Sequence, residues 1–84
     1  MSKVFGIAIA GLGTVGSGVA TVIQHHGKQS SEIQLLGILE KNKEGKFSKD
    51  WYAKYPALFV EKLDQLVNNP EIHIIVETIG GRSF

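Results

Sequence analysis

Hydrophobic residues along the chain gather in three runs that are separated by polar or amphipathic segments. Apolar and small residues are nearly continuous over Lys3–Ala10 and predominate over Ile33–Leu39, and the third run, Ile72–Ile79, bears Ile72, Ile74, Ile75 and Val76. Runs as apolar as the first two are typical of strands that are covered on both faces. We therefore expect three strands, the last of which ends at Gly80-Gly81.

The segment between the first two runs has the spacing of an amphipathic helix. Its apolar side chains recur at offsets of 0, 4, 7 and 8, which places them on one helical face: Val15, Val19, Val22 and Ile23. Gly16 and Ala20 share the side of the helix that is suited to close packing. We expect this helix to span Thr14–His26, with Gly27 as the residue that ends it and a polar connection over 28–31.

The stretch after the second run is rich in aromatic residues and has no clear period. We expect a loop or short helix at 48–54 and a short strand near Leu58–Val60, because Pro56 interrupts any longer helix. A second helix is predicted over Glu61–Asn68, and its apolar face consists of Leu63, Leu66 and Val67. The element order is therefore β-α-β-(β)-α-β. This order predicts an α/β fold of the Rossmann-like, three-layer kind, with a mostly parallel sheet and right-handed crossovers.

Composition limits the classes of function. The chain has 84 residues, which is enough for one domain, and its hydrophobic content of 43% is ordinary for a soluble globular protein. A net charge of +1 gives no support for a nucleic-acid partner. No apolar run approaches the roughly 18 residues of a membrane span, so we expect no membrane partner and a cytoplasmic location. The chain contains no cysteine, which excludes disulfides and thiolate metal sites.

A glycine-rich turn joins the first strand to the first helix. It reads Gly11-Leu12-Gly13-Thr14-Val15-Gly16, which is G-x-G-x-x-G directly after a strand and at the start of a helix. Gly11 allows a sharp turn, Gly13 allows a pyrophosphate to approach the backbone, and Gly16 allows the helix to lie close to the sheet. The helix N-terminus then faces the phosphates. The pattern predicts a nucleotide site, and the alternative is a tight turn without a ligand.

An acidic residue stands where the second strand ends. Glu40 follows Gly16 by 24 residues, close to the position at which dinucleotide-binding folds place an acid that binds the ribose hydroxyls of NAD, and this favours a dinucleotide site. The alternative is a solvated charge at the end of a strand. The next residue, Lys41, carries the opposite charge and could neutralise the 2′-phosphate of NADP. Lys43 and Lys46 are interpreted as solvated loop residues. The sequence therefore predicts NADP or NAD as the cofactor without deciding between them.

The end of the third strand is a second candidate for cofactor contact. If this strand lies beside the first, Ile79, Gly80 and Gly81 border the crevice in which open α/β sheets bind ligands. They would then line the nicotinamide half of the cofactor, and the alternative is an ordinary turn. We find no Ser/His/Asp or Cys/His set, and three scattered histidines do not make a metal site, so no catalytic or metal-binding residue is predicted.

Two blocks of the chain resemble the homoserine dehydrogenase family. The first is the glycine turn with its continuation, residues 11–19, and the second is Leu66–Gly81. Their order and separation are similar to those of the N-terminal nucleotide-binding part of that family. The resemblance covers nearly the whole chain and is weakest over 43–60.

The resemblance implies a function and a limit to it. Enzymes of this family interconvert aspartate 4-semialdehyde and homoserine by hydride transfer with NAD(P), in the biosynthesis of threonine and methionine. It implies that residues 11–16 cradle the pyrophosphate, that Glu40 and Lys41 lie at the ribose, and that 79–81 border the nicotinamide. We expect 1–84 to be a partial NAD(P)-binding domain without the substrate domain, and therefore without turnover of its own. Its last strand would have an open edge, through which copies could associate. The alternative is a stand-alone nucleotide-binding or dimerisation module.

Overall fold

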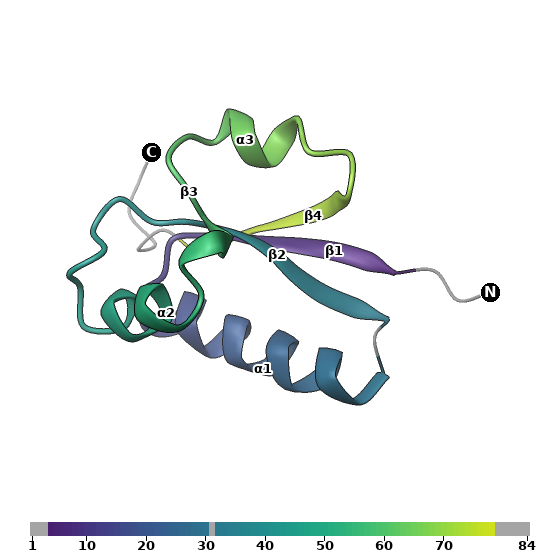
Figure 1. Ribbon diagram of the computed structural model, residues 1–84, viewed down its shortest axis with the longest axis horizontal. Coiled ribbons are helices and arrows are strands. Elements are labelled where there is room, and N and C mark those ends of the chain that lie inside the picture. Colours follow the sequence, from purple (N-terminus) through teal and green to yellow (C-terminus); the bar gives the residue numbers. More distant parts are fainter. Residues whose placement is uncertain (1–3, 31, 79–84) are drawn as a thin grey trace.

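Four strands form one sheet in the order β3-β2-β1-β4, and every pair of neighbours is parallel. The computed structural model describes residues 4–30 and 32–78. The strands of this sheet, drawn in Figure 1, are β1 (Phe5–Ala10), β2 (Ile33–Leu39), β3 (Phe59–Val60) and β4 (Ile72–Glu77). The expected α/β, Rossmann-like class is confirmed, and the sheet is wholly rather than mostly parallel.

Helices cover both faces of the sheet, as a three-layer fold requires. Figure 1 shows α1 and α2 on one face and α3 on the other. The helical segments are α1 (Thr14–Ser30), α2 (Ser48–Lys54), a 3₁₀ turn (Pro56–Leu58) and α3 (Asp64–Val67). The short helix and the short strand expected after residue 47 are therefore both present.

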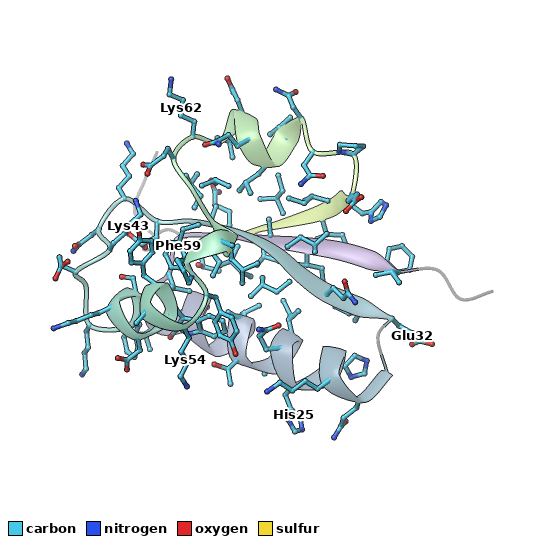
Figure 2. All side chains as sticks on the ribbon, viewed as in Figure 1. His25, Glu32, Lys43, Lys54, Phe59 and Lys62 are labelled. Atoms are coloured by element: carbon cyan, nitrogen blue, oxygen red, sulfur yellow. The ribbon has the colours of Figure 1, made fainter. Side chains whose placement is uncertain are left out.

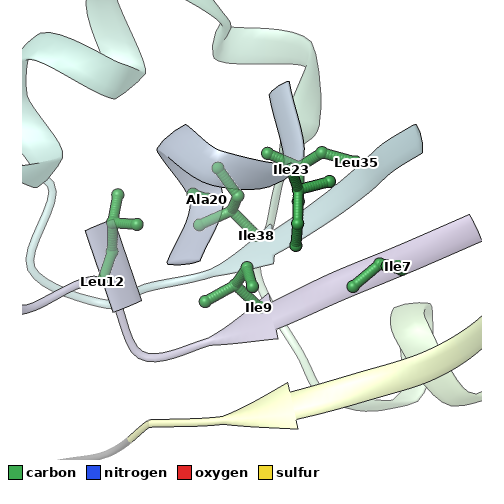
Figure 3. Close-up of a cluster of buried hydrophobic side chains, with 7 residues drawn as sticks. All are labelled: Ile7, Ile9, Leu12, Ala20, Ile23, Leu35 and Ile38. Atoms are coloured by element: carbon green, nitrogen blue, oxygen red, sulfur yellow. The ribbon is translucent and has the colours of Figure 1, made fainter. Parts of the chain in front are cut away.

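The main core lies between the sheet and α1. Figure 3 shows apolar side chains of β1, the glycine turn, α1 and β2 meeting in one cluster: Ile7, Ile9, Leu12, Ala20, Ile23, Leu35 and Ile38. Leu66 of α3 is fully buried on the other face. It lies over Gly37, where an added Cβ would stand only 2.5 Å from a Leu66 methyl group. This close approach explains why a glycine interrupts the apolar run of β2.

The first helix is longer than expected. It was predicted to end at His26, with Gly27 as the terminating residue, but α1 continues to Ser30 and contains Gly27. Residue 27 is a glycine for a steric reason instead, because a Cβ there would lie 2.8 Å from the backbone oxygen of Ile33, where the chain enters β2. Gly27 is therefore needed for the close approach of helix and strand rather than for a helix end.

The predicted apolar face of α1 is only half correct. Ala20 and Ile23 are buried and Val19 packs against them, whereas Val15 and Val22 are 65% and 67% exposed. The buried stripe is therefore displaced toward the side that carries Gly16 and Ala20. The same error applies to α3, where Leu66 is buried but Leu63 and Val67 are exposed.

Two element ends also differ from expectation. The helix predicted over Glu61–Asn68 is reduced to Asp64–Val67, because the side-chain oxygen of Gln65 accepts hydrogen bonds from the N–H groups of Glu61 (2.7 Å) and Lys62 (2.9 Å). Those two residues are therefore held outside the helix. The last strand ends at Glu77, and its expected end at Ile79 lies outside the described residues.

One residue of β4 has no partner in the register with β1. Gly6 pairs with Ile72 and Ile7 pairs with Ile74, so His73 is an extra residue in the ladder. Its ring compensates for the missing backbone partner, because Nδ1 accepts a hydrogen bond from the N–H of Gly6 at 3.0 Å. The ring also contacts Phe5 edge to face, with centroids 5.7 Å apart.

Candidate functional site

The site begins at the carboxyl end of β1, where the strand order reverses. β2 lies on one side of β1 and β4 on the other, and each is reached by a separate connection. In open α/β sheets the crevice at such a point is the usual ligand site. Residues after β4 were expected to border this crevice if β4 lies beside β1. The structure shows that the two strands are neighbours.

The glycine turn has the conformation that its sequence predicts. Gly11 has a φ of 98°, a value that favours glycine, and the chain turns there from β1 toward α1. The N–H of Gly11 still donates to the oxygen of Leu39 at 2.9 Å, so the turn remains attached to β2. The first bond of α1 follows at once, from the N–H of Ser17 to the oxygen of Gly13 at 2.9 Å.

The two later glycines of the motif have opposite surroundings. A Cβ on Gly13 would meet nothing within 4 Å, so the backbone there faces open space. Gly16 is buried, and a Cβ on it would collide with the oxygen of Gly11 and would stand 2.5 Å from the Thr78 hydroxyl. Gly13 thus leaves room for a group that approaches the turn, and Gly16 allows the helix to sit against it.

The N-terminus of α1 directly follows Gly13 and the open space beside it. The first N–H groups of a helix have no partner within the helix and carry partial positive charge. The first turn of α1 contains no acidic residue that would compensate for this charge. Thr14 and Val15, the first two helical residues, are exposed. The arrangement can therefore accept a phosphate group or another anion.

Glu40 reaches from the end of β2 to the glycine turn. Its Oε1 accepts a hydrogen bond from the N–H of Leu12 at 2.6 Å, and its Oε2 accepts one from the N–H of Asn42 at 3.0 Å. The carboxylate thereby joins the turn to the loop after β2. Leu12 as a whole is only 2% exposed, and its side chain lies in the core cluster.

Thr78 holds the turn from the opposite side. Its N–H donates to the oxygen of Ala10 at 2.8 Å, which continues the pairing of β4 with β1. Its hydroxyl donates to the oxygen of Gly11. The turn is therefore fixed by one side chain from each neighbouring strand end, Glu40 after β2 and Thr78 after β4.

These residues surround one cleft with a volume of about 410 Å³. That volume falls within the roughly 300–1,000 Å³ of small-molecule sites. The lining residues come from all three strand ends: Gly11, Leu12, Gly13, Leu39, Glu40, Lys41 and Thr78. A second cleft of about 330 Å³ lies between α1 and α2, on the side of α2 that carries Lys54 in Figure 2, and contains neither the glycine turn nor a strand end.

The lysines after Glu40 do not all face the cleft. Lys41 lines it, whereas the ammonium of Lys43 binds the carboxylate of Glu61 at 3.2 Å and lies 5.8 Å from the ring centre of Tyr52. Figure 2 shows Lys43 on the side of the molecule that carries Phe59. Lys46 lies 5.6 Å from the ring centre of Phe47. Lys46 is exposed, as expected of a solvated loop residue, whereas the Lys43 side chain is only 25% exposed, so the interpretation of Lys43 as solvated is wrong.

The predicted site residues divide into three groups. The structure brings Gly11, Leu12, Gly13, Glu40 and Lys41 together around the cleft, while Thr14, Val15 and Gly16 form the first turn of α1 beside it. Ile79, Gly80 and Gly81 lie outside the described residues. Sequence reasoning missed Thr78 and Leu39, which line the cleft, and Asn42, which holds Glu40. For Thr78 a signal was available, because it is a polar residue close to the predicted carboxyl end of the third strand, beside the predicted cofactor residues 79–81.

Membrane-spanning helices and metal-binding side-chain groups are both absent from the described part of the chain. None of its helices is long and apolar enough to cross a membrane. Residues 4–30 and 32–78 contain no group of three or more histidine, cysteine or acidic side chains that could hold a metal ion.

Comparison with known proteins identifies relatives over almost the whole chain. The family model described as "Homoserine dehydrogenase, NAD binding domain" matches residues 11–83. The structure is similar to that of homoserine dehydrogenase from S. aureus at pH 8.5, with a TM-score of 0.74 and 31% identity, and at pH 7.5, with a TM-score of 0.70 and 28% identity. Each similarity covers 99% of this chain and 21% of the S. aureus chain, so the chain spans about a fifth of those proteins. No curated protein sequence matches it.

Proposed function

The chain belongs to the family of homoserine dehydrogenase NAD-binding domains, and we propose that its turn at Gly11–Gly16 holds the pyrophosphate of NAD or NADP. The observation that carries the proposal is the open space beside Gly13 at the N-terminus of α1. A backbone without a side chain lets the diphosphate approach, and the helix amides supply donors and positive potential. The residues present therefore fit the cofactor.

Each remaining part of the site has a proposed role. Gly11 and Gly16 shape the turn, Leu12 contributes its backbone, and the first-turn amides of Thr14 and Val15 face the phosphates. Glu40 and Lys41 lie where the adenine-side ribose would be held. Ile79, Gly80 and Gly81, which follow β4, are proposed to border the nicotinamide.

We propose that this domain serves a homoserine dehydrogenase activity in the full-length enzyme. The reaction would be the interconversion of aspartate 4-semialdehyde and homoserine, in cytoplasmic threonine and methionine biosynthesis. The bound cofactor supplies the hydride chemistry, and this chain binds and orients it. Residues 1–84 are proposed to be a partial NAD(P)-binding domain, with the substrate-binding and catalytic groups in other parts of the enzyme.

Calorimetric titration of the 84-residue chain tests the proposal. We expect NADH or NADPH to bind, and ADP-ribose to bind more tightly than AMP, because AMP lacks the second phosphate of the diphosphate. Far-ultraviolet circular dichroism establishes first that the chain is folded. A folded chain that binds neither dinucleotide at millimolar concentration contradicts the proposal.

The edge of the sheet favours a second candidate, a stand-alone nucleotide-binding or dimerisation module without catalysis. Within the part of the chain that the structure describes, β4 pairs only with β1, and its Ile74 side chain is 47% exposed. An apolar edge strand is a template for pairing with a second copy of the chain. Self-association through β4 is therefore proposed for this candidate.

Light scattering separates the two candidates. A dimer that Ile74→Lys disrupts would favour the module, because a charge on an edge strand opposes strand pairing. Val67→Lys is the matched control, since Val67 is 61% exposed but lies on the helix α3 and not on a strand. A chain that is monomeric at high concentration contradicts association through β4.

A further inference from the structure

We propose that the cleft between α1 and α2 is a second binding site of this chain, one that takes a small aromatic carboxylate. The cleft has a volume of about 330 Å³, which falls within the roughly 300–1,000 Å³ of small-molecule sites. Its lining shares no residue with the cleft at the glycine turn. A ligand here would therefore leave the dinucleotide site free, and its binding does not depend on the proposed function.

The aromatic part of the lining is fixed in place by the core. Trp51 of α2 packs against the main apolar cluster, and Tyr55, directly after the same helix, has its ring centre 5.4 Å from that of Trp51. Both residues are half-buried and line the cleft. Because the core already holds Trp51, a ligand ring can pack against it with little loss of side-chain freedom. A flat aromatic group also gains from offset or edge-to-face contact with such rings.

The wall of the cleft on the side of α1 consists of polar side chains. Thr21, Gln24 and Lys28 follow one another at intervals of three and four residues, so they share one face of the helix. Figure 2 shows His25 of α1 and Lys54 of α2, which also line the cleft, on the same side of the molecule. A ligand that lies between the two helices therefore meets hydrogen-bonding groups as well as the rings.

The charges around the cleft favour an anion. Lys28 and Lys54 line it from the two helices, and no hydrogen bond or ion pair to a described residue engages either ammonium group. His25 is a further basic lining residue, and Asp50 is the acidic one. Asp50 stands in the first turn of α2, where the free helix amides partly offset its charge. The two lysines can therefore pair with a ligand carboxylate, and they would repel a cation that the rings alone could bind.

Trp51 provides a direct readout of this cleft. It is the single tryptophan of the chain, so its indole N–H gives one resonance in an NMR spectrum. We expect 3-phenylpropionate to shift this resonance and to bind with a dissociation constant on the order of 1 mM. Two matched probes separate the parts of the ligand, because 3-phenylpropan-1-ol lacks the charge and propionate lacks the ring. Each should bind at least about threefold more weakly than 3-phenylpropionate.

Charge variants test the role of the lysines. Lys28→Gln and Lys54→Gln should each weaken the binding of 3-phenylpropionate by about twofold to fivefold and leave that of 3-phenylpropan-1-ol unchanged. Lys49→Gln is the matched control, because Lys49 is an exposed residue of α2 that does not line the cleft. Asp50→Asn should tighten the binding of the carboxylate, since it removes a like charge.

The amide of Gly13 reports binding at the wrong place, because a carboxylate could also bind at the N-terminus of α1. A shift of the Gly13 amide without one of the Trp51 indole would overturn the proposal. Equal binding of the alcohol, equal affinities of the Lys28, Lys54 and Lys49 variants, or no indole shift at about 10 mM in a folded chain would do the same. NADH should not displace 3-phenylpropionate, and displacement would contradict a separate site. A chain that binds NADH but not 3-phenylpropionate refutes this site and leaves the proposed function standing.

Discussion

The hydroxyl of Thr78 donates a hydrogen bond to the backbone oxygen of Gly11, 67 residues earlier in the chain. This contact closes the turn on the side of β4, as Glu40 closes it on the side of β2. The glycine turn therefore does not stand alone: its shape depends on the ends of both strands that flank β1. The site is a meeting point of three strand ends rather than a local motif.

Replacing Thr78 tests this dependence. We expect Thr78→Val to lower the free energy of unfolding by about 1 kcal/mol, because a partly buried carbonyl loses its donor while the side-chain shape is kept. Thr78→Ser retains the hydroxyl and should lose less. Urea denaturation followed by circular dichroism measures both. Equal stability of Thr78→Val and the unmodified chain would show that the contact contributes nothing to the fold.

Gly13 and Gly16 should separate cofactor binding from folding. Gly13→Ala should leave the free energy of unfolding unchanged or slightly higher, because its Cβ would point into open space and the unfolded chain would lose freedom. Dinucleotide affinity should nevertheless fall by about tenfold or more, since the methyl group occupies the approach of the phosphates.

Gly16→Ala should show the reverse order of effects. Its Cβ would collide with the backbone oxygen of Gly11, so we expect unfolding at denaturant concentrations well below those of Gly13→Ala, with a loss of about 1–3 kcal/mol. Denaturation curves and cofactor titrations are measured on both variants. If Gly13→Ala binds the dinucleotide as tightly as the unmodified chain does, the proposed phosphate position is wrong.

Much of the fold could be predicted because each strand is marked by its own continuous segment of hydrophobic sequence. The bounds of β2 were predicted to the residue, and the turn at Gly11–Gly16 lies where its pattern placed it. The spacing of hydrophobic residues did not show which side of α1 would face the sheet, because valines occupy two sides of the helix. The stripe that carries Gly16 and Ala20 became buried since only small residues allow the helix to approach so closely.

The candidate site was predictable in its backbone but not in its side-chain contacts. Glu40 was placed near the turn by its spacing, yet the spacing does not tell which amides its oxygens bind. Thr78 escaped notice because its contacts are with Ala10 and Gly11, far earlier in the chain, and they depend on strand order and register. Asn42 escaped notice because it holds Glu40 through its backbone amide, which the type of its side chain does not reveal.

His73 offers a test of the irregular pairing between β1 and β4. His73→Ala should lower the free energy of unfolding by about 1 kcal/mol, because the amide of Gly6 loses its acceptor. The contact with the Phe5 ring is lost as well. His73→Asn offers an oxygen close to the position of Nδ1 and should recover part of the loss.

Amide hydrogen exchange measured by NMR locates this effect. The Gly6 amide should exchange faster in His73→Ala than in His73→Asn, while the amide of Ser17, which bonds within the α1 turn, should change little beyond any global loss of stability. Unchanged protection of Gly6 in His73→Ala would mean that the ring does not hold this amide.

Two glycines within α1 give the final test, because helix propensity predicts the same effect for both and the structure predicts opposite ones. A glycine inside a helix is less favourable than alanine by about 0.8–1.0 kcal/mol. At Gly18 nothing lies within 4 Å of an added Cβ, so Gly18→Ala should raise the free energy of unfolding by up to that amount.

At Gly27 the Cβ would lie 2.8 Å from the oxygen of Ile33, and this backbone atom can move away only if the start of β2 shifts. The strain should exceed the gain in propensity, so Gly27→Ala should unfold at a lower urea concentration than the unmodified chain. If both alanine variants were stabilised equally, α1 would have to end before Gly27, as the sequence pattern predicted.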